Sequence, residues 1–515
     1  MTAPHQLSAV EARRLIVAGE LSPVELVDAC LARVEAVDPA VNAMVTRAGE
    51  RARAEARVAA EAVAHARRAA TGGAAGAGET GGGGELGLLH GLPVAIKDLQ
   101  ATEGIVTTLG AADLADHVPT ADSGIVARVR AAGGIVVGKT NIPERSIGAN
   151  TVNRLFGATG NPFDPDRTCG GSSGGSAVAV ATDMVPLATG SDHGGSLRIP
   201  ACYCGVVGHR ATPGVVPFEE RTMTQTFYSV QGPMARTVDD TALLLAAITD
   251  RSITPASGLG DPMAHPLDHT AFTRLDELDP TELRIGVSED LGGVLVSAEV
   301  RRQFRRRVDR LVAAGVRCVE VPLDLSAAAD VDWRVRSDIF ATQYHREAET
   351  WDDGFNPHVR RSYEAALAAS VADIAAARRT QMELYQHTRA TLGGLDAIVC
   401  PGVSVAPFDW RQLNPVEVDG TPVENYMAWL SLTAAITVVG HPVTALPAGL
   451  DDDGLPVGVQ VVGHAHGDHR LLGVARALEA VFAAEVSTAR PRPDEAVLAR
   501  EHPALRTDGP LVQLD

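Results

Sequence analysis

Lysine is nearly absent from this chain of 515 residues. Of its 45 Lys and Arg side chains, only Lys97 and Lys139 are lysines. A coding preference for arginine explains the general depletion but not the two exceptions. Arginine stays protonated at any accessible pH, whereas a desolvated lysine can lose its proton. The two retained lysines therefore mark positions at which a titratable amine is expected to matter.

Cysteine and long apolar runs are also scarce. Six cysteines are too few for a disulfide scaffold in a chain of this length, and the first residues show no basic segment followed by an apolar run. The most apolar long window, residues 431–450, contains His441, Pro442 and Pro447, which do not suit a membrane span. We therefore expect a cytoplasmic protein that does not cross a membrane.

The charge balance argues against nucleic acid and anionic membranes as partners. A formal net charge of −19 opposes binding to nucleic acid or to an anionic membrane, because phosphate contact needs a clustered basic face. The one dense basic run, residues 301–310, is typical of the solvated face of a helix. With 45% hydrophobic and 21% charged residues, the composition is that of a globular chain with a large core.

The order of apolar segments predicts an α/β fold, and the length allows one large domain or two to three smaller ones. Residues 1–68 have helical spacing, with Ser22 as an N-cap, Pro23 at the first helical position and Glu25 at the third. Further along the chain, short apolar strands alternate with Gly-rich turns and helical patterns. We expect strands at 92–96, 134–137, 317–321, 397–400 and 457–462, and helices after Ser176 and at 297–313, 355–392 and 468–482. Residues 71–86, which are rich in glycine, predict a flexible surface loop.

Lys139 lies in a segment that imitates a phosphate-binding loop. Residues 133–140 match the pattern G-x-x-x-x-G-K-[ST] letter for letter. A phosphate cradle needs a flexible loop between its glycines and a helix that starts at the lysine. Here the spacer is Ile-Val-Val, which favours a strand, and Pro143 follows soon after. The pattern therefore does not predict a nucleotide site.

Two clusters of glycine and serine carry the candidate chemistry. The first, CGGSSGGSAVAVA at 169–181, is typical either of a flexible linker or of a loop that enters a small-residue helix, and the apolar continuation favours the helix. The second, SDHGGSLRIP at 191–200, places Ser196 after two glycines and offers backbone N–H groups suited to an oxyanion hole. Neither is a Gly-x-Ser-x-Gly nucleophile elbow, and a histidine-based triad stays open with 16 histidines in the chain.

Together these segments resemble the amidase signature family. The resemblance rests on GLPVAIKD at 91–98, on the two clusters, and on further matches at 138–144, 156–162, 232–236 and 454–460. It covers nearly the whole chain, is densest from 90 to 240, and accounts for the false phosphate-loop match as a family strand-turn segment. The fold that it implies is one large α/β/α domain over residues 1–515, with a central mixed sheet flanked by helices.

The resemblance also implies a catalytic set. Ser196 is its nucleophile, Ser172 is a bridging serine in a cis peptide, and Lys97 is the general base. The family's oxyanion hole maps to the backbone N–H groups of His193, Gly194, Gly195 and Ser196. Two further residues have open roles: Ser173 as a hydrogen-bond partner or a structural residue, and Arg198 as a substrate-binding residue or a structural ion pair.

The chemistry of this set is consistent with the residue types. A serine hydroxyl needs a base, and a neutral lysine can serve through a second hydroxyl that shuttles the proton. Half-deprotonation of a lysine at pH 7 needs a downward pKa shift of about 3.4 units, which costs roughly 4.6 kcal/mol. Since the overall negative charge opposes this shift, either local desolvation lowers the pKa of Lys97 or the enzyme works best at alkaline pH.

Two departures from the family pattern do not affect Lys97, Ser172 or Ser196. His193 replaces a residue that is usually small or aliphatic, and His209-Arg210 replaces a more typical apolar–lysine pair. A zinc site is a rival interpretation for a set of cysteines and histidines that are scattered along the chain. Because the resemblance places Cys204 in a packed position, we expect no metal or organic cofactor at these side chains. The set comprises Cys169, Cys202, Cys204, His464, His466 and His469.

The predicted function is a serine-dependent C–N hydrolase. Amides are the first expectation for the substrate, with esters and carbamates as side activities, and residues 297–430 are expected to supply a variable part of the substrate pocket. Four aromatic residues are considered for its walls, with core packing as the alternative role: Tyr228, Trp333, Tyr344 and Trp429. The alternative functions are the glutaminase subunit of a tRNA-dependent amidotransferase and a non-enzymatic binding protein. A homodimer is left open.

Overall fold

The computed structural model describes residues 2–71, 86–221, 226–346, 348–351 and 356–507. The Gly-rich loop expected at 71–86 falls almost entirely on residues 72–85 and so lies outside the described residues. Within the part of the chain that is described, no helix combines the length and apolar character needed to cross a membrane.

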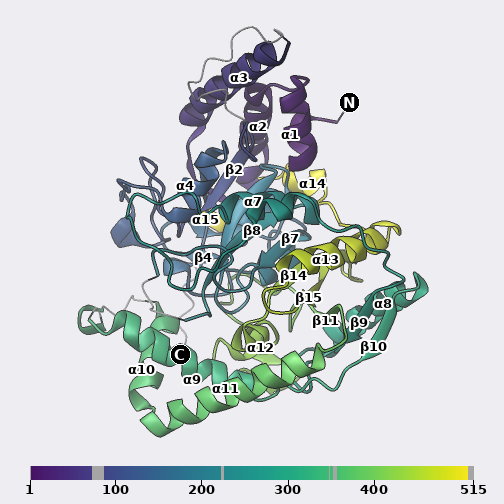
Figure 1. The fold of residues 1–515 in the computed structure, drawn as a ribbon. Helices are drawn as coiled ribbons and strands as arrows, with labels where there is room; N and C mark the ends of the chain where they lie inside the picture. The colour runs from purple at the N-terminus through teal and green to yellow at the C-terminus, as the bar shows by residue number, and fades with distance from the viewer. Residues whose placement is uncertain (1, 72–85, 222–225, 347, 352–355, 508–515) are drawn as a thin grey trace.

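The N-terminal layer consists of three helices that lie together at one end of the molecule (Figure 1). They are α1 (Ala9–Ala18), α2 (Pro23–Val41) and α3 (Gly49–Thr71). The predicted start of α2 is confirmed, because Ser22 and Glu25 form a capping box around Pro23. The expectation of an all-helical layer is wrong at β1 (Met44–Arg47), which pairs antiparallel with β3. A strand of four residues is too short to show a period of its own.

A mixed sheet of eleven strands forms the centre of the fold, as expected. Their order is β1-β3-β2-β6-β8-β7-β14-β15-β11-β9-β10. β2 pairs in parallel with β3 and β6, and β9 pairs in parallel with β10 and β11, whereas the other pairs are antiparallel. The bounds are β2 (Pro93–Lys97), β3 (Ile135–Thr140), β6 (Leu187–Asp192), β7 (Val207–Arg210), β8 (Val230–Ala235), β9 (Arg284–Val287), β10 (Arg317–Glu320), β11 (Ala397–Pro401), β14 (Val443–Leu450) and β15 (Pro456–Val462). Two small two-stranded sheets pair β4 (Val152–Asn153) with β5 (Gly157–Ala158), and β12 (Glu417–Val418) with β13 (Thr421–Pro422).

Helices cover both faces of this sheet. They are α4 (Gly124–Ala131), α5 (Gly174–Ala181), α6 (Arg198–Cys204), α7 (Val238–Ile248), α8 (Ala298–Ala313), α9 (Ala328–Tyr344), α10 (Pro357–Ala368), α11 (Val371–Thr391), α12 (Ser431–Val439), α13 (Asp468–Ala483), α14 (Glu495–Leu498) and α15 (Ala504–Thr507). Helices α9, α10 and α11 lie at the end opposite to α1–α3 (Figure 1).

Two sequence expectations for these helices need correction. The helical stretch expected at 355–392 is two helices, because Ser370 interrupts it and begins α11 with a capping box. In the basic run on α8 most arginines are partly or fully exposed, as predicted, but Arg307 is buried and donates to the carbonyl oxygens of Ala448 and Leu450. Arg307 therefore anchors α8 to β14.

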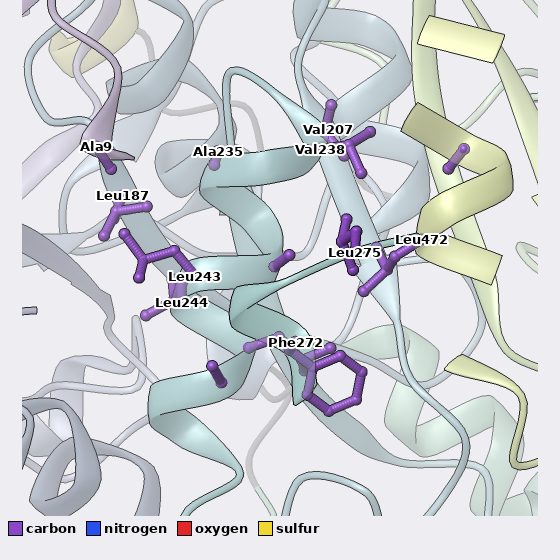
Figure 2. Close-up of a cluster of buried hydrophobic side chains, with 14 of the residues drawn as sticks. Ala9, Leu187, Val207, Ala235, Val238, Leu243, Leu244, Phe272, Leu275 and Leu472 are labelled. Atoms are coloured by element: carbon purple, nitrogen blue, oxygen red, sulfur yellow. The ribbon is translucent and has the colours of Figure 1, made fainter. Parts of the chain in front are cut away.

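The alternation of strand residues divides the core into two layers. Val94 and Ile96 of β2 pack in the cluster with α7 and α13, whereas Ala95 packs on the other face with α5 and α6. Figure 2 shows the first cluster, in which Leu243 and Leu244 of α7 lie near Leu187 of β6 and Ala9 of α1, while Leu472 of α13 lies next to Leu275. Burying a leucine of this kind contributes about 1.5–3 kcal/mol to folding.

Candidate active site

Strand β2 determines where Lys97 points. Side chains alternate along a strand, so Lys97 shares the face of Ala95, where α5 covers the sheet. The predicted Gly/Ser cluster leads directly into α5, which starts at Gly174 rather than after Ser176. The fold therefore brings Lys97 and the Ser172–Ser173 segment together although 75 residues separate Lys97 from Ser172.

Lys97 is fully buried, and its amine lies among three serine hydroxyls. Its Nζ is 2.7 Å from Ser172 Oγ, 2.9 Å from Ser173 Oγ and 2.8 Å from Ser191 Oγ. We call Lys97 and these three serines the lysine–serine cluster. Burial lowers the pKa of Lys97 well below its ordinary value, against the opposing effect of Asp192. A neutral amine has two N–H donors and one lone pair, so one of the three hydroxyls can donate its proton to Nζ.

The backbone before α5 holds Ser172 in place. The Gly171–Ser172 peptide bond is cis, and Gly170 adopts a positive φ of 77°. Ser172 Oγ also lies 2.8 Å from Ser146 Oγ, so it bridges Lys97 and a serine on a separate loop. Ser146 carries no motif in the sequence, and only the fold places it here.

Ser196 lies on the loop that joins β6 to α6. Its carbonyl oxygen accepts a hydrogen bond of 3.3 Å from the N–H of Ser173, which fixes the loop against the lysine–serine cluster. Ser196 and Ser172 line the same pocket. Among the described residues the Ser196 hydroxyl has no side-chain hydrogen bond, so the contact from Ser196 Oγ to Ser172 Oγ is not formed in this conformation.

The expected oxyanion donors are not equivalent in the structure. The N–H of Gly195 donates to Asp192 Oδ1 at 3.0 Å, so this donor is already occupied. The N–H groups of His193, Gly194 and Ser196 have no side-chain acceptor within the described part of the chain. Gly195 has a φ of 135°, and a Cβ there would lie 2.4 Å from Thr433 Oγ1, which explains the glycine.

Beneath this loop lies a buried charge cluster. Asp192 forms ion pairs of 3.0 Å with both Arg198 and Arg210, and all three side chains are fully buried. Burial alone would raise the pKa of Asp192, but the two guanidinium groups outweigh it and hold the pKa below its ordinary value. Two cations against one carboxylate leave one positive charge below the loop.

Arg198 has a structural environment. Besides Asp192, its guanidinium donates to Thr433 O at 2.8 Å, to Gln460 Oε1 at 2.9 Å and to Thr437 Oγ1 at 2.9 Å. It does not line the pocket that holds Ser196. Of the two roles considered for Arg198, the structure favours the ion pair.

The pocket above Ser196 has a volume of about 160 Å³. Its walls come from the loop 145–149, from Phe218, Arg221, Thr226 and Ser229, and from the expected variable region. Of the four aromatic residues considered, Tyr344 lines the pocket, whereas Tyr228 and Trp429 are buried in the core and Trp333 packs against it. The other aromatic rings of the wall are Phe218, Phe340 and Tyr426.

His193 extends its side chain into this pocket. Its Nδ1 lies 2.7 Å from Ser229 Oγ, and its ring packs near Tyr228 and Phe340. Burial, followed by the positive charges of Arg336 and Arg210, lowers the pKa of His193 well below its ordinary value. The imidazole is therefore neutral at pH 7.

Lys139 has a different role because it lies on the other face of the sheet. A register shift in β3 pairs Lys139 with Ile96 rather than with Lys97. Its Nζ donates to the carbonyl of Gln100, to Thr102 Oγ1 at 2.9 Å and to Thr107 Oγ1 at 3.0 Å. Lys139 lies inside a strand, which excludes the phosphate-loop interpretation.

We expect Lys139→Met to lower the free energy of unfolding by about 3 kcal/mol, the scale for breaking a buried polar pair. Lys139 lies 3.9 Å from Asp98, and burial lowers the pKa of Lys139 to about 7 while it raises the pKa of Asp98. The change leaves Asp98 without its ion-pair partner and the Gln100 carbonyl without this donor. Urea unfolding at pH 7 measures the loss, and the double variant Lys139→Met/Asp98→Asn should recover part of it. An unchanged unfolding curve would contradict this structural role.

The cysteines and histidines considered for zinc do not gather. The cysteines of the set, Cys169, Cys202 and Cys204, are buried free thiols, and burial raises their pKa values. The described residues contain no group of three or more His, Cys, Asp or Glu side chains that could hold a metal ion. His464, His466 and His469 instead contact Leu395 O, Thr212 Oγ1 and Arg274 O respectively, the second through its backbone N–H.

Comparisons with known proteins identify the family and the fold. The family model described as Amidase matches residues 25–472. An acylamidase of Rhodococcus erythropolis is 32% identical over 484 residues, which cover 93% of this chain and 96% of the relative. One glutamyl-tRNA(Gln) amidotransferase subunit, from Acidothermus cellulolyticus, is 33% identical over 503 residues, which cover 92% of this chain and 94% of that relative. Among solved structures, a bacterial aryl acylamidase of the amidase signature family superposes with a TM-score of 0.81 at 25% identity, over 94% of this chain and 98% of that one.

Proposed function

Since this chain belongs to the amidase signature family and hydrolyses amide C–N bonds, we propose that it does so through an acyl-enzyme formed on Ser196. The observation that carries the proposal is the buried amine of Lys97, held among three serine hydroxyls next to the pocket that contains Ser196. A desolvated lysine is the base that a serine nucleophile needs in a site without a local histidine–carboxylate pair.

Acylation begins when Ser196 Oγ attacks the substrate carbonyl carbon. The Ser196 proton passes to Ser172 Oγ as the Ser172 proton moves to Lys97 Nζ, which becomes an ammonium group. The tetrahedral intermediate then collapses: the C–N bond breaks, and the nitrogen takes a proton back from Lys97 through Ser172. The leaving group is ammonia or an amine.

Deacylation repeats these proton transfers with water. Water attacks the ester carbonyl of the acyl-enzyme and gives its proton to the same relay. Ser196 recovers its proton as the acid leaves, so the enzyme returns to its starting state. The proposed steps use no metal or organic cofactor.

Two features stabilise the developing oxyanion. The N–H groups of His193, Gly194 and Ser196 are the donors offered by the loop, since Asp192 occupies the N–H of Gly195. The net positive charge of the Asp192, Arg198 and Arg210 cluster lies below them in a water-excluded region. Preorganised donors of this kind are each worth roughly 10²–10³ in kcat.

An amide, an ester and a carbamate test the acyl-enzyme. We expect an aryl amide and an aryl ester of one carboxylic acid to reach the same kcat whenever deacylation limits turnover, because both form the same acyl-Ser196. The carbamate forms a carbamoyl-enzyme instead, so its kcat need not equal the kcat of the amide and the ester. Burst kinetics measure the shared step, and labelling by a fluorophosphonate followed by peptide mass spectrometry places the adduct. An adduct on another residue would overturn the proposal.

The glutaminase subunit of a tRNA-dependent amidotransferase is the second candidate function. The relatives named as subunits of glutamyl-tRNA(Gln) amidotransferases support it. This function needs a partner protein and an ammonia channel. Stoichiometric co-purification with a second protein would favour it, whereas turnover of aryl amides by the isolated chain favours the amidase. A cytoplasmic location and a homodimer stay predictions.

A further inference from the structure

One arginine in the substrate pocket lacks a partner for part of its guanidinium group. Arg336 on α9 is 4% exposed and lines the pocket. Its Nε lies 3.3 Å from Asp332 Oδ2 and its Nη1 lies 3.4 Å from the Tyr426 hydroxyl, whereas Nη2 has no hydrogen-bond partner among the described residues. Arg221, which lines the same pocket, differs because its Nε, Nη1 and Nη2 all donate, to Asp261 and to the carbonyls of residues 226 and 229.

The unpartnered nitrogen of Arg336 lies close to the oxyanion loop. A Cβ built on Gly194 would lie 2.7 Å from Arg336 Nη2. The guanidinium carbon lies 5.7 Å from the centroid of the Phe340 ring, and the His193 ring packs on the same Phe340 at 6.1 Å. Arg336 and His193 therefore flank one aromatic wall of the pocket.

His193 supplies a second unpartnered atom at this wall. Its Nε2 is buried and has no hydrogen-bond partner within the described residues. When Ser229 Oγ donates to Nδ1, the neutral ring carries its proton on Nε2 and becomes a donor. Two donors without acceptors then lie at one wall of the pocket.

The charges favour an anion as the missing acceptor. Within the described part of the chain, Asp332 is the only carboxylate that forms an ion pair with Arg336. The Oδ1 atom of Asp332 is itself buried and has no hydrogen-bond partner among the described residues. Burial raises the pKa of this carboxyl group. The cluster of Asp192, Arg198 and Arg210 adds one net positive charge beneath the neighbouring loop. A carboxylate matches the planar fork of a guanidinium group better than a neutral carbonyl does.

We infer that Arg336, with His193 beside it, binds a carboxylate on the acyl part of the substrate, so that the preferred substrates are amides of dicarboxylic acids. This rests on the proposed function. The carboxylate belongs to the acyl part because the leaving nitrogen must face Ser172, which returns its proton. Arg336 lies beside the oxyanion loop at Gly194, and its hydrogen bonds go to Asp332 and Tyr426 rather than to the lysine–serine cluster.

The test compares glutaryl p-nitroanilide with its methyl ester, which differs by the loss of one charge. We expect the wild type to have a kcat/KM at least about 10-fold higher for the acid, mainly through a lower KM, the scale of one charge-assisted hydrogen bond. In Arg336→Gln this acid-to-ester ratio should fall to about 1, whereas Arg336→Lys should keep part of it. Arg334→Gln is the matched control, since Arg334 lies on the same helix in an exposed pair with Asp330 and should keep the wild-type ratio.

Folding is controlled by a second variant. Because Arg336→Gln leaves Asp332 buried without its partner, Arg336→Gln/Asp332→Asn removes both charges and should show the same loss of the ratio. Equal kcat/KM for acid and ester in the wild type, or an unchanged ratio in both variants, would overturn the inference. If a fluorophosphonate does not label Ser196 in the wild type, the proposed function fails instead, so the two failures are distinguishable.

Discussion

Replacing Ser196 by alanine is expected to lower kcat for amide hydrolysis by about 10⁶-fold, the scale found when a serine nucleophile is removed. The residual rate comes from substrate binding and from the oxyanion donors, which are backbone groups that the substitution keeps. The free energy of unfolding should stay within about 0.5 kcal/mol of the wild type, because the Ser196 hydroxyl has no side-chain hydrogen bond within the described residues. Burst-phase kinetics and thermal unfolding measure the two quantities.

Ser431→Ala is the matched control for this variant. Ser431 is a buried serine whose Oγ also lacks a hydrogen-bond partner in the described part of the chain, but it does not line the pocket. It should keep the wild-type kcat. If Ser196→Ala retained more than about a hundredth of the activity, another residue would be the nucleophile, and a fluorophosphonate adduct would identify it.

The sequence predicts the parts of the fold that depend on local patterns. The capping box at Ser22 and the short strands predicted at 92–96 and 134–137, which the structure places at 93–97 and 135–140, follow from residues that are neighbours in the chain. The two Gly/Ser clusters could be located because the backbone there needs glycine for close approaches, as at Gly195. The α/β class follows from the same alternation of segments, whereas the central mixed sheet is what the family resemblance implies.

The rest depends on contacts between distant segments. Ser146 joins the site through a loop that no motif marks, and Ser191, although it begins the second Gly/Ser cluster, has no role that its sequence position indicates. Arg336 lies far from Gly194 in the sequence and meets it only because α9 folds over the pocket. The register shift in β3 decides which face Lys139 occupies, and because all six residues of β3 are buried, no alternation of buried and exposed positions marks this shift.

Lys97→Met is expected to lower kcat/KM by about 10³-fold, the range of general base catalysis. The active form of the base is the neutral amine, so wild-type activity should rise with pH through the pKa of Lys97 and then level off. Burial lowers this pKa well below the ordinary value of 10.5, which moves the rising limb toward neutral pH. In Lys97→Met the limb assigned to Lys97 should disappear. Lys97→Arg should be equally inactive, because a guanidinium group stays protonated; full activity in this variant would end the neutral-lysine proposal.

The same lowered pKa has a consequence for stability. Below pH 10.5 the unfolded chain binds a proton at Lys97 that the folded chain holds less tightly, so the stability of the wild type falls as pH decreases from 10.5 toward the folded pKa. Lys97→Met lacks the amine that binds this proton. As the pH is lowered through this window, the free energy of unfolding of Lys97→Met should therefore increase relative to that of the wild type, by about 1.4 kcal/mol per pH unit. Urea unfolding of both proteins at several pH values measures the difference, and a constant difference would show that Lys97 is protonated in the folded enzyme. A base kept neutral by burial thus destabilises the fold under the conditions in which it catalyses.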